Sequence, residues 1–184
     1  MTTLRERIID FLYRMATDAT RIRPWLTPLF GFVFFAVVVF LILISFYLDR
    51  FFEWPAFLSR PVRMALSLPF LLGGALLWLW CAVKFLKTKG TPVPVNPPPT
   101  LITDGPYAYS RNPMMTGLFG VMIGIGIFFG SVTLTFIMTP LFVAASILEF
   151  KYIEEPELSR RFGKAYEAYK KKTPIIIPRI GPKT

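Results

Sequence analysis

The chain has 184 residues, of which 54% are hydrophobic and 17% are charged, and its net charge is +10. Soluble domains are about 45–50% apolar and about 25% charged, so this composition excludes a water-soluble globule. The absence of His and the single Cys, Cys81, exclude His-ligated metals, Ser-His and Cys-His nucleophiles, disulfides and Cys-cluster metal sites. We interpret the positive charge as a match to anionic lipid headgroups rather than to nucleic acid.

The N-terminal segment, residues 1–28, is predicted to lie on the membrane surface. Its apolar residues recur at helical spacing beside basic residues, which is typical of an interfacial amphipathic helix. The residues of this pattern are Leu4, Arg5, Arg7, Ile8, Phe11, Leu12, Arg14 and Met15. A cleavable signal peptide is not indicated, because the apolar run begins too late and no small-residue cleavage site follows it.

Residues 29–90 are predicted to hold two membrane spans. Leu29–Leu48 contains 20 uncharged residues, which form a helix of about 30 Å and match the hydrocarbon thickness of a bilayer. Met64–Val83 is a second run of 20 uncharged residues. Each run is therefore long enough to cross the membrane once.

A third uncharged stretch, Asn112–Leu148, has 37 residues. As one straight helix it would be about 55 Å long, which is too long for a single span. Gly130-Ser131 lies at its centre, so we predict a tight helical hairpin with arms at Met114–Phe129 and Val132–Phe150. The predicted fold is an all-α polytopic membrane helix bundle of about four spans, which forms one domain over residues 1–184.

The distribution of basic residues supports an even number of spans. Eighteen of the 21 lie in three segments that four spans place on the same side of the membrane. The positive-inside rule then puts both termini in the cytoplasm. The other three, Arg50, Arg60 and Arg63, lie between the first two spans.

Residues 91–178 are predicted to carry the chemistry. Thr91–Thr100 holds five prolines, so it is expected to be extended rather than helical. The chain then reads TDGPYAYSRNPMMTG from Thr103, with Asn112-Pro113 suited to the N-cap and first position of a helix. Free backbone N–H groups there, with Arg111 beside them, suit a carboxylate or phosphate. Alternatively, Arg111 is one more positive-inside residue next to a helix cap.

Acidic residues gather where the second arm of the hairpin ends. Glu149, Glu154, Glu155 and Glu157 are four of the eleven acids of the chain. Their carboxylates either accept hydrogen bonds from ribose hydroxyls or pair with a cation, or they are solvated charges that offset nearby Lys and Arg. The segment after Pro156 is predicted to be an amphipathic cytoplasmic helix, which either closes over a site or anchors the chain to the membrane surface.

The blocks GPYAYSRNPMMTG and EEPELSRRFGKAYEAYKKKTPIIIP flank the apolar hairpin. In this order they resemble the isoprenylcysteine carboxyl methyltransferase family and the wider group that includes the phospholipid methyltransferases. The family pattern is GPY, RHPxYxG, an apolar hairpin, EExxL, FGxxYxxY and a closing run with proline. The resemblance covers Thr103–Pro178, and residues 1–90 share only their hydrophobicity. Asn112 replaces the family His, and Met115 replaces the family Tyr.

The resemblance implies that S-adenosylmethionine binds at the cytoplasmic face, between the hairpin and the C-terminal segment. Arg111 is expected near the methionine carboxylate, and Glu154 and Glu155 near the ribose or the ammonium group. Arg111 and Glu155 are the expected catalytic residues, and we expect both at the rim of the bundle. The full set of expected cofactor contacts is Tyr107, Arg111, Asn112, Pro113, Gly117, Glu154 and Glu155.

Methyl transfer from a sulfonium is an in-line displacement, so the enzyme mainly aligns donor and nucleophile and excludes water. A carboxylate or thiolate acceptor needs no general base, whereas a protonated amine would require Glu154, Glu155 or a Tyr as the base. Carboxyl or thiol methylation of a lipid-like or prenylated-peptide substrate is therefore favoured. The alternatives are a membrane reductase of the sterol type that uses NADPH, which has a similar HPxYxG segment, and a non-catalytic membrane protein that keeps the scaffold.

Overall fold

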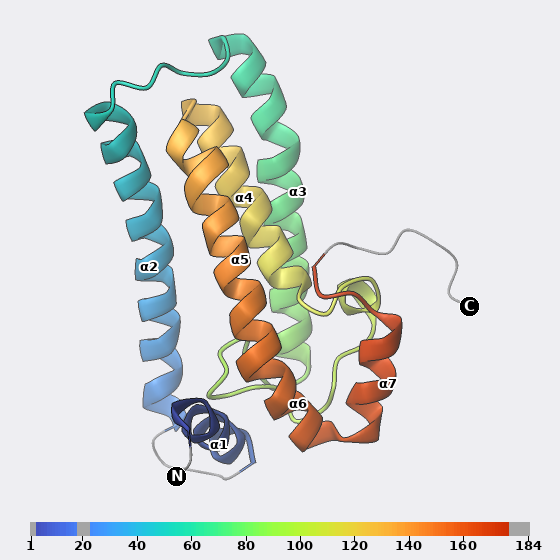
Figure 1. The fold of residues 1–184 in the computed structure, drawn as a ribbon. Helices are drawn as coiled ribbons and strands as arrows, with labels where there is room; N and C mark the ends of the chain where they lie inside the picture. The colour runs from blue at the N-terminus through green and yellow to red at the C-terminus, as the bar shows by residue number, and fades with distance from the viewer. Residues whose placement is uncertain (1–2, 18–22, 177–184) are drawn as a thin grey trace. The chain divides into compact units, whose positions relative to one another are not determined.

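The computed structural model describes residues 3–17 and 23–176, and within these ranges it contains helices and connecting segments but no strand (Figure 1). The all-α prediction is confirmed. The helical elements are α1 (Leu4–Thr17), α2 (Arg23–Phe51), α3 (Arg60–Lys87), η1 (Gly105–Ala108), α4 (Pro113–Phe129), η2 (Thr133–Met138), α5 (Thr139–Glu149), η3 (Phe150–Glu154), α6 (Glu155–Phe162) and α7 (Lys164–Lys172).

Three helices of the described ranges are long and apolar enough to cross a membrane, namely Trp25–Phe51, Arg60–Lys87 and Thr133–Phe162. The helix Pro113–Phe129 is apolar but shorter. It ends at the predicted residue, and the chain turns at Gly130, whose φ of +71° lies in the left-handed region that glycine tolerates. The predicted helical hairpin is therefore confirmed.

The second arm of the hairpin is longer than predicted, because the helix continues past Phe150 to Phe162. Pro156 lies inside it, where proline lacks an N–H and crowds the carbonyl four residues earlier. The helix is locally widened into a π-helix at η3, and the Glu155 N–H donates to the Phe150 oxygen, five residues back. The Tyr152 oxygen, four residues before the proline, instead accepts a 2.9 Å hydrogen bond from Arg5 Nε.

The chain divides into two compact units. The first, called the bundle unit here, comprises Val33–Leu79 and Met114–Ala145. Within it, parts of α2, α3, α4, η2 and α5 run side by side (Figure 1). Its core is centred on Val38, Met122 and Leu134, which come from α2, α4 and η2. The apolar stretches of the sequence thus pack through one face and leave large side chains exposed on the other, as expected where lipid surrounds the helices.

Close packing of α3 on α4 depends on glycine. A methyl group at Gly74 would lie 2.6 Å from the Gly117 oxygen and 2.8 Å from the Val121 nitrogen, whereas one at Gly73 would have no atom within 4 Å. We therefore expect Gly74→Ala to destabilise the protein by about 1–3 kcal/mol through overpacking. The adjacent control, Gly73→Ala, is expected to be neutral or stabilising by up to about 1 kcal/mol. Thermal unfolding in detergent measures both changes, and equal stability of the two variants would contradict this packing.

A polar contact secures the turn of the hairpin within the bundle unit. Asp49, near the end of α2, accepts hydrogen bonds from the backbone N–H of Thr133 at 2.9 Å and from its hydroxyl at 2.6 Å. A carboxylate in this position satisfies N–H groups that the start of a helix leaves unpaired. Asp49 therefore caps the helix that begins after Gly130.

The other unit, called the site unit here, comprises Met1–Phe32, Trp80–Pro113 and Ser146–Thr184. The proline-rich segment before η1 contains no regular helix, as predicted. Helix α1 forms at the predicted N-terminal position, and Leu12 and Met15 are buried against Val95 of the proline-rich segment. Predicted features that lie outside the described residues are the basic residues Arg21, Arg179 and Lys183 and the end of the closing run, Ile177 and Pro178.

Candidate functional site

Arg111 is held in place by the C-terminal segment. The backbone N–H of Arg111 donates to the Pro174 oxygen at 2.8 Å, and that of Asn112 donates to the Ile175 oxygen at 3.0 Å. The Ser110 hydroxyl also donates to the Ile175 oxygen, at 2.8 Å. The predicted anion site concerns the N–H groups of the first turn of α4, which these bonds do not test. The backbone N–H of Asn112 is itself engaged in the fold. It joins the chain before α4 to the beginning of the closing run.

The ends of the hairpin meet in a buried group of charges. Arg111 forms an ion pair with Glu155, and Lys170 lies 2.6 Å from the other carboxylate oxygen of Glu155. The Arg111 and Glu155 side chains are only 8% and 4% exposed, and the Lys170 side chain is 38% exposed. The expected proximity of Arg111 and Glu155 is confirmed, and both side chains are buried, which their predicted place at the rim of the bundle did not indicate. The closing run and α7 explain their burial, because both pack over this group.

A cavity beside Arg111 is lined mainly by aromatic rings and prolines. The Tyr107 ring packs edge-on against Phe85, with 5.9 Å between the ring centroids. The Tyr169 hydroxyl donates a hydrogen bond to the backbone oxygen of Tyr107 at 2.7 Å. The Arg111 guanidinium lies 5.8 Å from the centre of the Phe150 ring. The aromatic and charged side chains that line this cavity include those of Phe85, Tyr107, Arg111, Phe150, Glu154, Phe162, Tyr166 and Tyr169.

The tyrosines of this cavity stay protonated at neutral pH. Burial raises the pKa of Tyr107, and the nearby Cys81 and Glu154 raise it further. Burial also raises the pKa of Tyr166 and of Tyr169. These phenols can therefore donate hydrogen bonds, but they are poorly suited to act as general bases.

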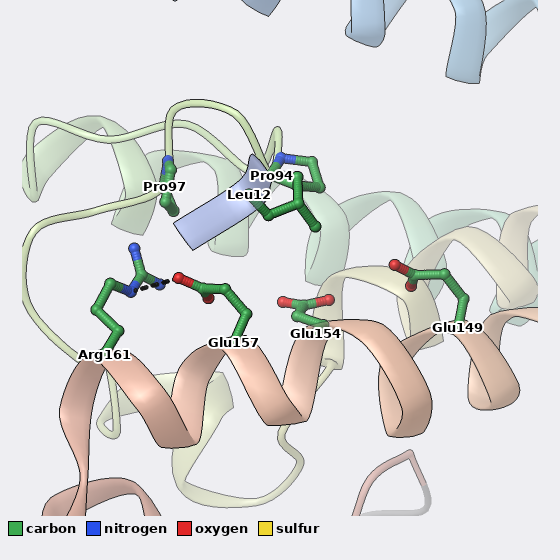
Figure 2. Close-up of a pocket in the computed structure, with 7 residues that line it drawn as sticks. All are labelled: Leu12, Pro94, Pro97, Glu149, Glu154, Glu157 and Arg161. Carbon is green, nitrogen blue, oxygen red and sulfur yellow. Dashed lines mark ion pairs between the residues drawn. The ribbon is translucent and has the colours of Figure 1, made fainter. Parts of the chain in front are cut away.

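An acidic row adjoins this cavity (Figure 2). Glu149, Glu154 and Glu157 point from one helix toward the proline-rich segment and α1, and Arg161 Nε lies 3.2 Å from Glu157 Oε1. Glu149 and Glu154 are five residues apart. Their side chains lie on the same side of the helix because the wider π-helical turn of η3 connects them. Within the described ranges, no group of three or more acidic or Cys side chains is arranged to hold a metal ion.

The predicted site residues divide between the two units. Tyr107, Arg111 and Glu154 line the aromatic cavity, and Glu155 joins them through its ion pair with Arg111. Asn112 and Pro113 directly follow Arg111 in the chain and belong to the same unit. Gly117 belongs to the bundle unit, where it packs against the Gly74 backbone, so a cofactor contact for it stays a prediction.

Sequence reasoning missed Lys170 and Phe150 as parts of the site. Lys170 contacts the carboxylate that Arg111 also contacts, and Phe150 lies beside the Arg111 guanidinium. Lys170 directly follows the FGxxYxxY block, so its position next to Tyr169 was the available signal. Phe150 had no comparable signal, because it is one of 19 Phe residues in a largely apolar chain.

Residues 62–165 match the family model described as phospholipid methyltransferase. Over 86 residues the chain is 38% identical to protein-S-isoprenylcysteine O-methyltransferase of Schizosaccharomyces pombe, covering 44% of this chain and 34% of that protein. Over 102 residues it is 30% identical to the nickel-cobalt-cadmium resistance protein NccN of Alcaligenes xylosoxydans xylosoxydans, covering 55% of this chain and 43% of that protein. The matches therefore span less than half the length of these curated relatives.

Proposed function

The chain belongs to the phospholipid methyltransferase family, and from this premise we propose that it is an integral-membrane methyltransferase that uses S-adenosylmethionine. The observation that carries the proposal is the aromatic cavity, which combines flat rings with the buried cation Arg111 and the carboxylate of Glu154. In the described structure, Arg111 Nε is buried and has no hydrogen-bond partner. Such a donor is costly to leave unpaired, so it favours a ligand with an anionic group at this point.

The residues of the cavity fit the chemical parts of this cofactor. The rings of Phe85, Tyr107 and Phe150 offer apolar faces for the adenine base. Arg111 would bind the methionine carboxylate, and Glu154 would accept hydrogen bonds from the ammonium group or the ribose hydroxyls. Glu155 would orient Arg111, because its carboxylate is held by Arg111 and Lys170 together.

When bound, the cofactor supplies an electrophilic methyl group on a sulfonium. The residues of this chain have to hold the donor, orient it and exclude water. Because the buried tyrosines are poor bases and Glu155 is engaged by two cations, we favour an acceptor that is already anionic. We therefore propose carboxyl or thiol methylation of a lipid-like or isoprenylcysteine-type substrate. Methylation of an amine would instead depend on Glu154 as the base.

Calorimetric titration of the purified protein with S-adenosylhomocysteine, the cofactor product, and separately with NADPH tests the proposal. We expect S-adenosylhomocysteine to bind and NADPH not to bind. Binding of NADPH alone would point to a membrane reductase. Binding of neither ligand by folded protein would point to a non-catalytic membrane protein that keeps the scaffold.

We propose that both termini and the cofactor site face the cytoplasm, because 18 of the 21 basic residues would then lie on that side. In a Cys81→Ala background, Thr3→Cys is expected to react with a membrane-impermeant thiol reagent only from the cytoplasmic side. The matched control, Arg60→Cys at the other end of the spans, is expected to react only from outside. Reaction of Thr3→Cys from outside would contradict this orientation.

A further inference from the structure

Helix α1 divides its apolar side chains between two surroundings. Leu12 and Met15 are 9% and 6% exposed and pack against Val95. Leu4 and Phe11 are 75% and 43% exposed on the same helix. The outer side of the helix therefore carries large apolar side chains that the described chain leaves uncovered.

The inner side of α1 forms part of the wall of the candidate site. Leu12 lies against the acidic row and lines the same pocket as Glu154 and Glu157 (Figure 2). Polar contacts hold the helix there, because Arg160 forms an ion pair with Asp10 and its guanidinium lies 4.1 Å from the centre of the Tyr13 ring. Displacement of α1 would therefore open one side of the row that includes Glu154.

The outer side of α1 carries a stripe that alternates apolar and basic residues. Leu4, Arg7, Phe11 and Arg14 follow one another at spacings of three and four residues, so they lie along one face of the helix. Arg7 and Arg14 are exposed. This outer stripe matches a surface that is apolar below and negatively charged above, as an anionic lipid headgroup layer is.

The chain keeps α1 close to the membrane surface. The end of α1 at Thr17 and the start of α2 at Arg23 are six residue steps apart, which reach at most about 20 Å. Trp25 at the start of α2 is 80% exposed, as is typical of an aromatic residue at the headgroup level. The outer stripe is therefore within reach of the bilayer that α2 enters.

We propose that the outer stripe of α1 docks on anionic lipid headgroups and that this docking holds the inner side of α1 against the cofactor site. Anionic lipid then strengthens cofactor binding, since binding at two linked sites is reciprocal. The docking is independent of the proposed methyltransferase function, whereas the effect on the cofactor rests on that function.

The docking is tested in lipid nanodiscs of phosphatidylcholine, with or without phosphatidylglycerol. An environment-sensitive fluorophore is attached to Leu4→Cys in the Cys81→Ala background. Phosphatidylglycerol is expected to shift its emission to the blue. Arg7→Gln with Arg14→Gln should reduce the ratio of docked to free α1 about 25-fold, at about fivefold per arginine. The control pair Arg50→Gln with Arg60→Gln should leave the shift unchanged. The same emission in both lipids would overturn the docking.

The coupling is tested by calorimetry with S-adenosylhomocysteine in the same two nanodiscs. We expect tighter binding in the presence of phosphatidylglycerol, by at most the factor measured for docking, and loss of this difference in the Arg7→Gln, Arg14→Gln protein. Equal affinity in both lipids, with the fluorophore still reporting docking, would overturn the coupling alone. No binding in either lipid would overturn the proposed function and the coupling, while the emission shift still decides the docking.

Discussion

Replacement of Glu155 by alanine is expected to lower the free energy of unfolding by about 3–5 kcal/mol, the usual effect of removing one partner from a buried ion pair. The Glu155 side chain is 4% exposed, and its carboxylate is shared by Arg111 and Lys170. Its removal leaves Arg111, which is 8% exposed, without the carboxylate that compensates its charge. Lys170 is affected less, because it is 38% exposed and reaches water. Thermal or denaturant unfolding in detergent measures the loss.

Two further variants show whether the loss of stability comes from the buried ion pair. Glu167→Ala removes an exposed acid of α7 that accepts a 2.6 Å hydrogen bond from Ser159, and it should cost about 1 kcal/mol or less. The double variant Glu155→Ala, Arg111→Ala removes both buried charges and should be more stable than Glu155→Ala alone. A Glu155→Ala protein as stable as the Glu167→Ala control would show that the buried pair contributes little to folding.

The hairpin was predictable because its signals are local. Gly130-Ser131 interrupts a charge-free stretch that is too long for one span, and a chain that returns to its starting side must bring Arg111 and Glu155 together. No knowledge of packing was needed for either step. The burial of both residues was not predictable in this way, because it depends on the chain after Glu155, where Lys170 of α7 contacts the Glu155 carboxylate.

Features that depend on contacts between distant segments were not predictable. The second arm continues past Pro156 through a π-helix, and the backbone oxygen of Tyr152 accepts a hydrogen bond from Arg5, which is 147 positions away. For Lys170 the sequence offered only its position next to Tyr169, and its contact with Glu155 depends on where α7 packs. The predicted arm ended at Phe150, close to the end of the charge-free stretch at Leu148, and no local signal showed that the helix continues to Phe162.

Arg111→Ala is expected to weaken binding of S-adenosylhomocysteine by roughly 10- to 150-fold. A charged hydrogen bond to a carboxylate contributes about 1.5–3 kcal/mol, and about 1.4 kcal/mol corresponds to a factor of ten. The variant should stay folded, because Glu155 keeps Lys170 as its partner at 2.6 Å. Glu155→Gln should weaken binding less, since the amide still offers an oxygen acceptor near Arg111.

The charge and the shape of Arg111 can be separated with a conservative variant. Arg111→Lys keeps the positive charge but loses the planar fork of donors, so its affinity for S-adenosylhomocysteine should lie between those of the native and the Arg111→Ala proteins. Arg60→Ala, an exposed arginine at the start of α3, is the control and should bind normally. Native affinity in a folded Arg111→Ala protein would show that Arg111 does not hold the cofactor carboxylate. Its role would then be to neutralise Glu155 within the folded chain, and the buried Arg111 Nε would belong to a structural ion pair.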